Sequence, residues 1–258
     1  MIEFSSRQFR KVRRLAKFAA VLLRARAEFR RLEAQGPVAI ATRVRLLQKW
    51  CGDSLASLGI QVEVEGTPPN HGLLLSNHLS YLDILAYSSV TLCAFVSKAE
   101  VATWPFFGQY AVYGGTIFIQ RQERSAARRG NQEVVEYLRQ GVPVVLFPEG
   151  TTTDGSHILR FHPSMLQPAI DAAVAVTPCA VAYEVSDGSE KDVAWWGEMT
   201  LAPHAWNLVG KKSIRAKVVF GEPLTRSSNR KVMSGAARQR VVDLRTRLVN
   251  SRSVESNQ

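Results

Sequence analysis

The sequence of 258 residues is poor in cysteine, and the spacing of its cysteines narrows the possible classes of protein. Cys51, Cys93 and Cys179 are odd in number, widely separated and without a Cys-x-x-Cys pair. This pattern argues against a disulfide framework and against a thiolate zinc site, and it fits a reducing compartment. The four histidines at positions 71, 157, 162 and 204 lack the paired spacing of metal ligands, so we expect no metal site.

The sequence also lacks a long apolar run and a serine nucleophile motif. The longest apolar run near the N-terminus, residues 18–23, is far shorter than the roughly 20 residues of a membrane-spanning helix. No small-residue cleavage site follows this run, so we expect no secretory signal. The absence of Gly-x-Ser-x-Gly argues against a serine esterase.

Acidic residues are outnumbered by basic ones, 22 to 33, which gives a formal net charge of +11. Such a charge indicates an anionic partner: nucleic acid, a lipid surface, or acidic carriers and substrates. The charge is dense in residues 7–33, where apolar side chains recur every three or four positions without proline or glycine. We predict one long basic amphipathic helix there, which favours attachment to anionic lipid. A helix packed on its own domain and a nucleic-acid arm are the alternatives.

A second helix is predicted over residues 38–58, so residues 1–59 form a basic, membrane-attaching helical hairpin. Residues 60–258 then alternate between short apolar strands and helical segments, ending in a helix over 230–250. This alternation predicts an α/β fold with a largely parallel central sheet flanked by helices. The predicted strands cover 62–65, 72–76, 93–97, 116–120, 143–147, 176–183 (with a turn inside) and 213–220, and the intervening helices cover 82–90, 124–140 and 163–173.

The first candidate site is the segment Ser76-Asn77-His78-Leu79-Ser80-Tyr81-Leu82-Asp83, which follows an apolar strand and opens a helix. A histidine at the strand end and an aspartate in the first helical turn can meet across the turn between them. His78 would then be a general base whose tautomer Asp83 fixes. The alternative is a capping box of Ser80 and Asp83 that closes a helix N-terminus.

Two further strand ends carry polar residues. The strand over 116–120 leads to Arg121, whose guanidinium suits phosphate, and Lys98 could reach the same pocket, although either cation could also be a solvated surface charge. The segment Phe147-Pro148-Glu149-Gly150-Thr151-Thr152 leaves the sheet at its proline, as an ordinary turn would also do. Because parallel sheets place their sites beyond the carboxyl ends of strands, these loops could form one site.

In order, Asn-His-x-x-x-x-Asp, Gly-x-x-Phe-Ile-x-Arg, Phe-Pro-Glu-Gly-Thr and a Val-x-Pro-like strand resemble the glycerolipid acyltransferase family over residues 60–225. The resemblance implies transfer of a fatty acyl group from an acyl thioester to a lysolipid hydroxyl, without a cofactor or metal. His78 and Asp83 would be the catalytic pair. Substrate would contact a second set of residues: Asn77, Lys98, Gly115, Arg121, Glu149, Gly150, Thr151 and Thr152.

The resemblance implies 1-acyl-glycerol-3-phosphate or a related lysophospholipid as acceptor, and acyl-CoA or acyl carrier protein as donor. It also implies a peripheral or monotopic enzyme on the cytoplasmic face of the inner membrane, with no nucleic-acid partner. Many phosphatidate-forming members carry arginine where this chain has Thr152, which removes a strong phosphate ligand. The Thr-Thr-x-Asp-Gly variant and the later Trp195-Trp196-Gly197-Glu198-Met199 resemble bacterial relatives that acylate other lysolipids, so the alternative acceptor is lyso-ornithine lipid. The alternative class is a non-catalytic basic membrane-binding protein.

Overall fold

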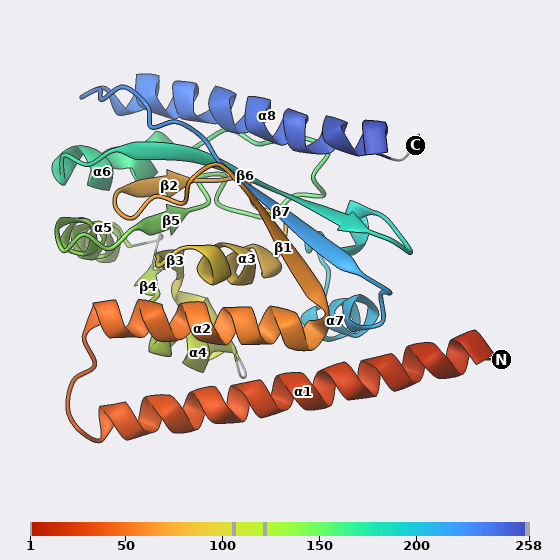
Figure 1. Cartoon of the computed structure of the whole chain (residues 1–258). Helices are drawn as coiled ribbons and strands as arrows, with labels where there is room; N and C mark the ends of the chain where they lie inside the picture. The colour runs from red at the N-terminus through yellow and green to blue at the C-terminus, as the bar shows by residue number, and fades with distance from the viewer. Residues whose placement is uncertain (1, 105–106, 121–122, 256–258) are drawn as a thin grey trace.

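The computed structural model describes residues 2–104, 107–120 and 123–255 (Figure 1). Its centre is a seven-stranded sheet in the order β1-β7-β6-β2-β5-β3-β4. All strand pairs are parallel except β6 and β7, which are antiparallel. The strands are β1 Ile60–Glu65, β2 Leu73–Leu75, β3 Ala94–Lys98, β4 Ile117–Ile119, β5 Val144–Leu146, β6 Val176–Val185 and β7 Ile214–Phe220.

Helices cover both faces of the sheet because the strand side chains alternate between two cores. Leu74 packs with residues of α2 and α3, whereas its neighbours Leu73 and Leu75 pack with residues of α5 and α8. The α-helices are α1 Ile2–Glu33, α2 Ile40–Leu58, α3 Leu82–Val90, α4 Phe107–Tyr113, α5 Arg124–Arg139, α6 Gln167–Asp171, α7 Leu201–Val209 and α8 Arg230–Glu255. Short 3-10 turns lie at η1 Ala99–Thr103, η2 Pro163–Leu166 and η3 Glu190–Asp192.

The first two helices form an antiparallel hairpin, with α2 against α3 and α1 outside it (Figure 1). The N-terminal half of α1 is held on the end of α7 by arginines: Arg10 donates to Gly210 O, and Arg14 donates to the carbonyls of Val209 and Lys211. These contacts satisfy carbonyls that the end of α7 would otherwise leave unpaired. No helix in the described part of the chain combines the length and apolar character needed to cross a bilayer.

The predicted α/β fold behind a helical hairpin is confirmed, and each of the seven predicted strands is present. Three details of the prediction are wrong. β6 runs without a turn through Pro178, residues 163–173 divide into η2 and α6, and the helices α4 and α7 were not predicted. The three cysteines are buried free thiols.

Candidate active site

The predicted pair of His78 and Asp83 forms beyond the carboxyl end of β2, where the chain turns into α3. His78 Nδ1 lies 2.8 Å from Asp83 Oδ2, and the carboxylate is fully buried. Because an ionised carboxylate can only accept hydrogen bonds, it fixes the imidazole tautomer with the proton on Nδ1. The other ring nitrogen, Nε2, is then the basic atom that a substrate hydroxyl can meet.

Backbone and side-chain donors hold the Asp83 carboxylate on every side. Oδ2 also accepts from the backbone N–H groups of Leu79 at 2.7 Å and Ser80 at 3.0 Å, and Oδ1 accepts from the Tyr183 hydroxyl at 2.7 Å. The contact with Ser80 N–H is the half of a capping box that the alternative interpretation predicted. The aspartate therefore holds the turn into α3 and orients the histidine at once.

The His78 ring and backbone are fixed by the loop that follows β5. The imidazole stacks on Phe147, with ring centroids 3.9 Å apart and planes 10° from parallel. The backbone N–H of His78 donates to Glu149 Oε1 at 2.9 Å, and the backbone carbonyl of His78 accepts from the backbone N–H of Thr153 at 3.0 Å. The histidine consequently has little freedom to leave its position between the two loops.

Asn77 and Glu149, both predicted to contact substrate, are buried and form hydrogen bonds with the backbone. Asn77 exchanges two hydrogen bonds of 3.0 Å with the backbone N–H and C=O of Val181 on β6. Glu149 Oε2 accepts from Leu159 N–H at 2.7 Å, so both of its oxygens serve backbone donors. Burial raises the pKa of Glu149, although these two donors oppose the shift. The structure gives both side chains a role in holding the loops that surround His78.

Two cavities meet at His78. The more polar of the two, here the polar cavity, has a volume of about 300 Å³ and is lined by Lys98, Gly150, Thr151 and Thr152 together with Trp104, Trp195 and Trp196. An apolar one of about 190 Å³ extends beneath the helical hairpin, where its walls include Phe18, Leu22, Leu47, Trp50, Leu85, Phe95, Tyr110 and Ala111. Tyr81, Ile84 and Phe147 border both cavities, so an amphiphile could place its polar and apolar parts on either side of the histidine.

The predicted substrate residues therefore separate into distinct groups. Lys98, Gly150, Thr151 and Thr152 line the polar cavity. Gly115 does not, because it precedes β4 at the opposite end of the strand, where a Cβ would clash with the Ile40 side chain of α2. Its positive φ of 77° and this close approach explain the glycine without a substrate. Arg121 lies outside the described residues.

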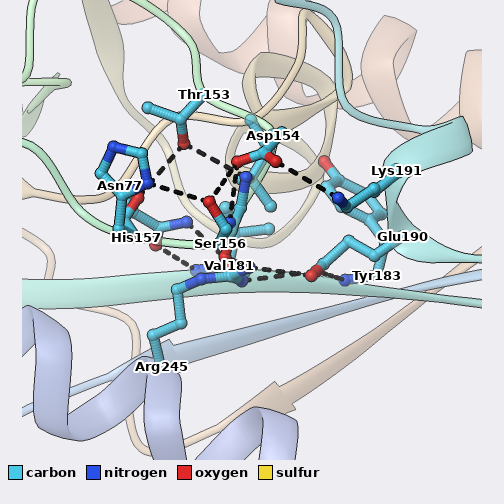
Figure 2. A network of polar contacts seen from close by, with 12 residues as sticks. Asn77, Thr153, Asp154, Ser156, His157, Val181, Tyr183, Glu190, Lys191 and Arg245 are labelled. Atoms are coloured by element: carbon cyan, nitrogen blue, oxygen red, sulfur yellow. Dashed lines mark hydrogen bonds and ion pairs between the residues drawn. The ribbon is translucent and has the colours of Figure 1, made fainter.

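The sequence did not indicate a network of polar contacts that joins β6, η3 and α8 (Figure 2). Arg245 of α8 donates to Val181 O at 2.8 Å and Gly155 O at 2.9 Å, and it pairs with Glu190 at 2.8 Å. Glu190 in turn accepts from Tyr183 N–H at 2.7 Å. No spacing in the sequence indicates these contacts, because their members come from β6, η3 and α8.

Tyr81, which borders both cavities, makes a further contact that the sequence does not indicate. Its hydroxyl lies 3.0 Å from His204 Nδ1 of α7. Burial lowers the pKa of His204 and raises that of Tyr81, so both groups are neutral near pH 7. The loop that carries Trp195 packs against the turn between β2 and α3, because the backbone N–H of Trp195 donates to Leu79 O at 2.8 Å.

Known proteins resemble this chain in sequence and fold. A family profile described as acyltransferase matches residues 60–182. A lyso-ornithine lipid O-acyltransferase of Brucella abortus is 35% identical, over 66% of this chain and 69% of its own. A 1-acyl-sn-glycerol-3-phosphate acyltransferase of Neisseria gonorrhoeae is 32% identical, over 82% and 83%. The crystal structure of the 1-acyl-sn-glycerophosphate acyltransferase from Thermotoga maritima has the same fold, with a TM-score of 0.65, 20% identity, and coverage of 94% of this chain and 97% of that one.

Proposed function

Because the chain belongs to the acyltransferase family that includes lyso-ornithine lipid and 1-acyl-sn-glycerol-3-phosphate acyltransferases, we propose that it transfers a fatty acyl group from an acyl thioester to the free hydroxyl of a lysolipid. The observation that carries this proposal is the buried pair of His78 and Asp83 at the junction of a polar and an apolar cavity. Acyl-CoA or acyl carrier protein is the donor.

In the proposed reaction His78 Nε2 takes the proton of the lysolipid hydroxyl as its oxygen attacks the thioester carbonyl. The C–O bond forms, and the carbonyl electrons move onto the oxygen to give a tetrahedral intermediate. When this intermediate collapses, the C–S bond breaks and the thiolate leaves with the proton that His78 holds. Asp83 stabilises the imidazolium between these two steps through its 2.8 Å contact with Nδ1.

The walls of the two cavities support binding of the fatty acyl chain in one cavity and of the headgroup in the other. Methylene groups gain about 0.8 kcal/mol each on burial, so a fatty acyl chain favours the apolar cavity beneath the hairpin. The headgroup would lie in the polar cavity, near Lys98, Thr151 and Thr152. Among the described residues of this wall, Lys98 is the only lysine or arginine.

We propose 1-acyl-glycerol-3-phosphate, or a related lysophospholipid, as the first acceptor to test. Lyso-ornithine lipid is the second candidate, because Thr152 offers a hydroxyl in place of a guanidinium and because relatives with that named activity are similar to this chain. A terminal phosphate carrying two charges would gain less from one lysine and two threonines than from a bidentate arginine.

We also propose that the hairpin, residues 1–59, attaches the enzyme to anionic lipid on the cytoplasmic face of the inner membrane, as a peripheral or monotopic protein. Phe9, Val12 and Leu23 leave 70%, 63% and 69% of their surface exposed. Their spacing places them on one side of α1, and exposed basic residues flank this apolar stripe: Arg13, Lys17 and Arg24. Apolar insertion combined with lysine and arginine near headgroups supports interfacial binding.

Acyl transfer by the purified protein tests the proposal. Radiolabelled acyl-CoA and acyl carrier protein are each offered with lysophosphatidate, lysophosphatidylcholine and lyso-ornithine lipid. His78→Ala is compared with His71→Ala, which removes an exposed histidine that lines neither cavity. We expect transfer that only His78→Ala abolishes, and the productive acceptor identifies the headgroup. Acyl transfer by His78→Ala would refute the mechanism. If the folded, vesicle-bound wild type transferred no acyl group with any combination of donor and acceptor, the result would favour a non-catalytic membrane-binding protein.

A further inference from the structure

Tyr183 has a fully buried side chain near the carboxyl end of β6, and its hydroxyl donates to Asp83 Oδ1 at 2.7 Å. Burial raises the pKa of this phenol well above its usual value, and the neighbouring Asp83 carboxylate raises it further. The hydroxyl is therefore protonated throughout the working pH range and always available as a donor.

This donor acts on the carboxylate oxygen that does not face the histidine. Oδ2 already accepts from His78 Nδ1 and from the N–H groups of Leu79 and Ser80, whereas Oδ1 accepts from Tyr183. A buried polar group needs hydrogen-bond partners, and donors on both carboxylate oxygens oppose rotation of the group. We propose that Tyr183 is a positioning residue for acyl transfer, which holds the Asp83 carboxylate with Oδ2 toward His78. The inference rests on the proposed role of His78 and Asp83.

The segment of β6 that carries Tyr183 is itself held from the far face of the sheet. Tyr183 N–H donates to Glu190, and Arg245 of α8 binds both Glu190 and Val181 O, two residues before the tyrosine. Figure 2 shows Arg245 reaching these groups from the helix beneath β6. Arg245 is nearly buried, so its bonds form where water competes weakly. The phenol consequently projects from a strand whose position is fixed at this point.

Tyr183→Phe tests the proposal, and Tyr87→Phe is its matched control. Tyr87 is equally buried and its hydroxyl lies 2.7 Å from Ser76 Oγ, so the control loses one buried hydroxyl contact that does not involve Asp83. A hydrogen bond to a charged group corresponds to about a 10- to 100-fold effect. We expect Tyr183→Phe to lower kcat by this factor with KM for both substrates unchanged. We expect Tyr87→Phe to keep kcat within about twofold while losing comparable thermal stability.

Repeating the substitution in an Asp83→Asn background separates positioning from a structural role. If Tyr183 acts through the carboxylate, Tyr183→Phe changes kcat of the Asp83→Asn enzyme by less than about twofold. Equal losses of kcat in the two backgrounds, or in the two tyrosine variants, would overturn the proposal. A wild-type kcat for Tyr183→Phe would overturn it too, provided His78→Ala is inactive. Activity of His78→Ala would instead refute the mechanism on which the inference rests.

Discussion

Replacing Asp83 with asparagine removes one charge from the dyad while keeping its shape. The asparagine oxygen can take the place of Oδ2 and accept from Leu79 N–H, Ser80 N–H and His78 Nδ1. The amide nitrogen would then face the Tyr183 hydroxyl, which can rotate to accept a hydrogen bond. We therefore expect a folded enzyme with the same histidine tautomer and without the carboxylate charge.

The size of the effect follows from the electrostatic interaction of an imidazolium with a carboxylate. The closest atoms of the pair lie 2.8 Å apart, and the centres of charge are therefore about 4 Å apart. At an effective dielectric constant of about 20, such a pair gains about 4 kcal/mol. If this interaction stabilises the transition state and is absent from the ground state, its loss lowers kcat about 1,000-fold.

The assay is the initial rate of acyl transfer at saturating donor and acceptor, with thermal unfolding measured on the same preparations. Asp53→Asn, an exposed substitution on α2, is the matched control and should keep the wild-type kcat. A loss of less than about tenfold in a fully folded Asp83→Asn enzyme would refute the electrostatic argument. The aspartate would then serve only to orient the ring.

Four further substitutions test other parts of the structure. Ala111→Leu adds three carbons to the wall of the apolar cavity. It should lower kcat/KM for the longest acyl chains about 50-fold and leave kcat/KM for short chains unchanged. An unchanged dependence of kcat/KM on chain length would place the acyl chain elsewhere. Glu149→Gln leaves one of two backbone N–H groups without an acceptor and should cost about 1–3 kcal/mol of unfolding free energy in denaturant titrations, whereas an unchanged midpoint contradicts this role. Burial lowers the pKa of His204, so the stability it contributes is complete above its unfolded value near 6.5 and declines as pH falls below it. The melting temperature should therefore fall less between pH 7.5 and 5.5 in His204→Gln than in the wild type, and equal falls would exclude this origin. Leu23→Glu should weaken binding to anionic vesicles in cosedimentation while Val232→Glu, similarly exposed on α8, does not; equal binding by both would argue against the α1 surface.

The parts of the site that the sequence could predict are those formed by neighbours in the chain. His78 and Asp83 are five residues apart, and a strand followed by a helix is enough to bring them together. Tyr183 lies 100 residues beyond Asp83, and Arg245 contacts Gly155 across 90 residues. Such contacts depend on strand order and on the packing of α8, neither of which a local pattern records.

Residue type alone did not indicate which polar side chains near the site bind the backbone. Asn77 and Glu149 are chemically suited to a ligand, yet their side chains are used by Val181, Leu159 and the N–H of His78. Buried N–H and C=O groups must be paired, and in loops around a site the nearest polar side chain often pairs them. Gly115 is likewise explained by the lack of space for a side chain beside α2.

The strand order has a consequence for how the protein is made. β1 lies at the edge of the sheet and pairs with β7. Ile60 can therefore form its strand pair only after Ile214 has been synthesised, 154 residues later in the chain (214 − 60). During synthesis at about 5–20 residues per second, α1 and α2 leave the ribosome well before the sheet can close. Both hairpin helices are therefore outside the ribosome while the strands of the sheet are still being made. A chain that stops before β7 would leave β1 without its partner and Tyr183 on a strand without its antiparallel neighbour.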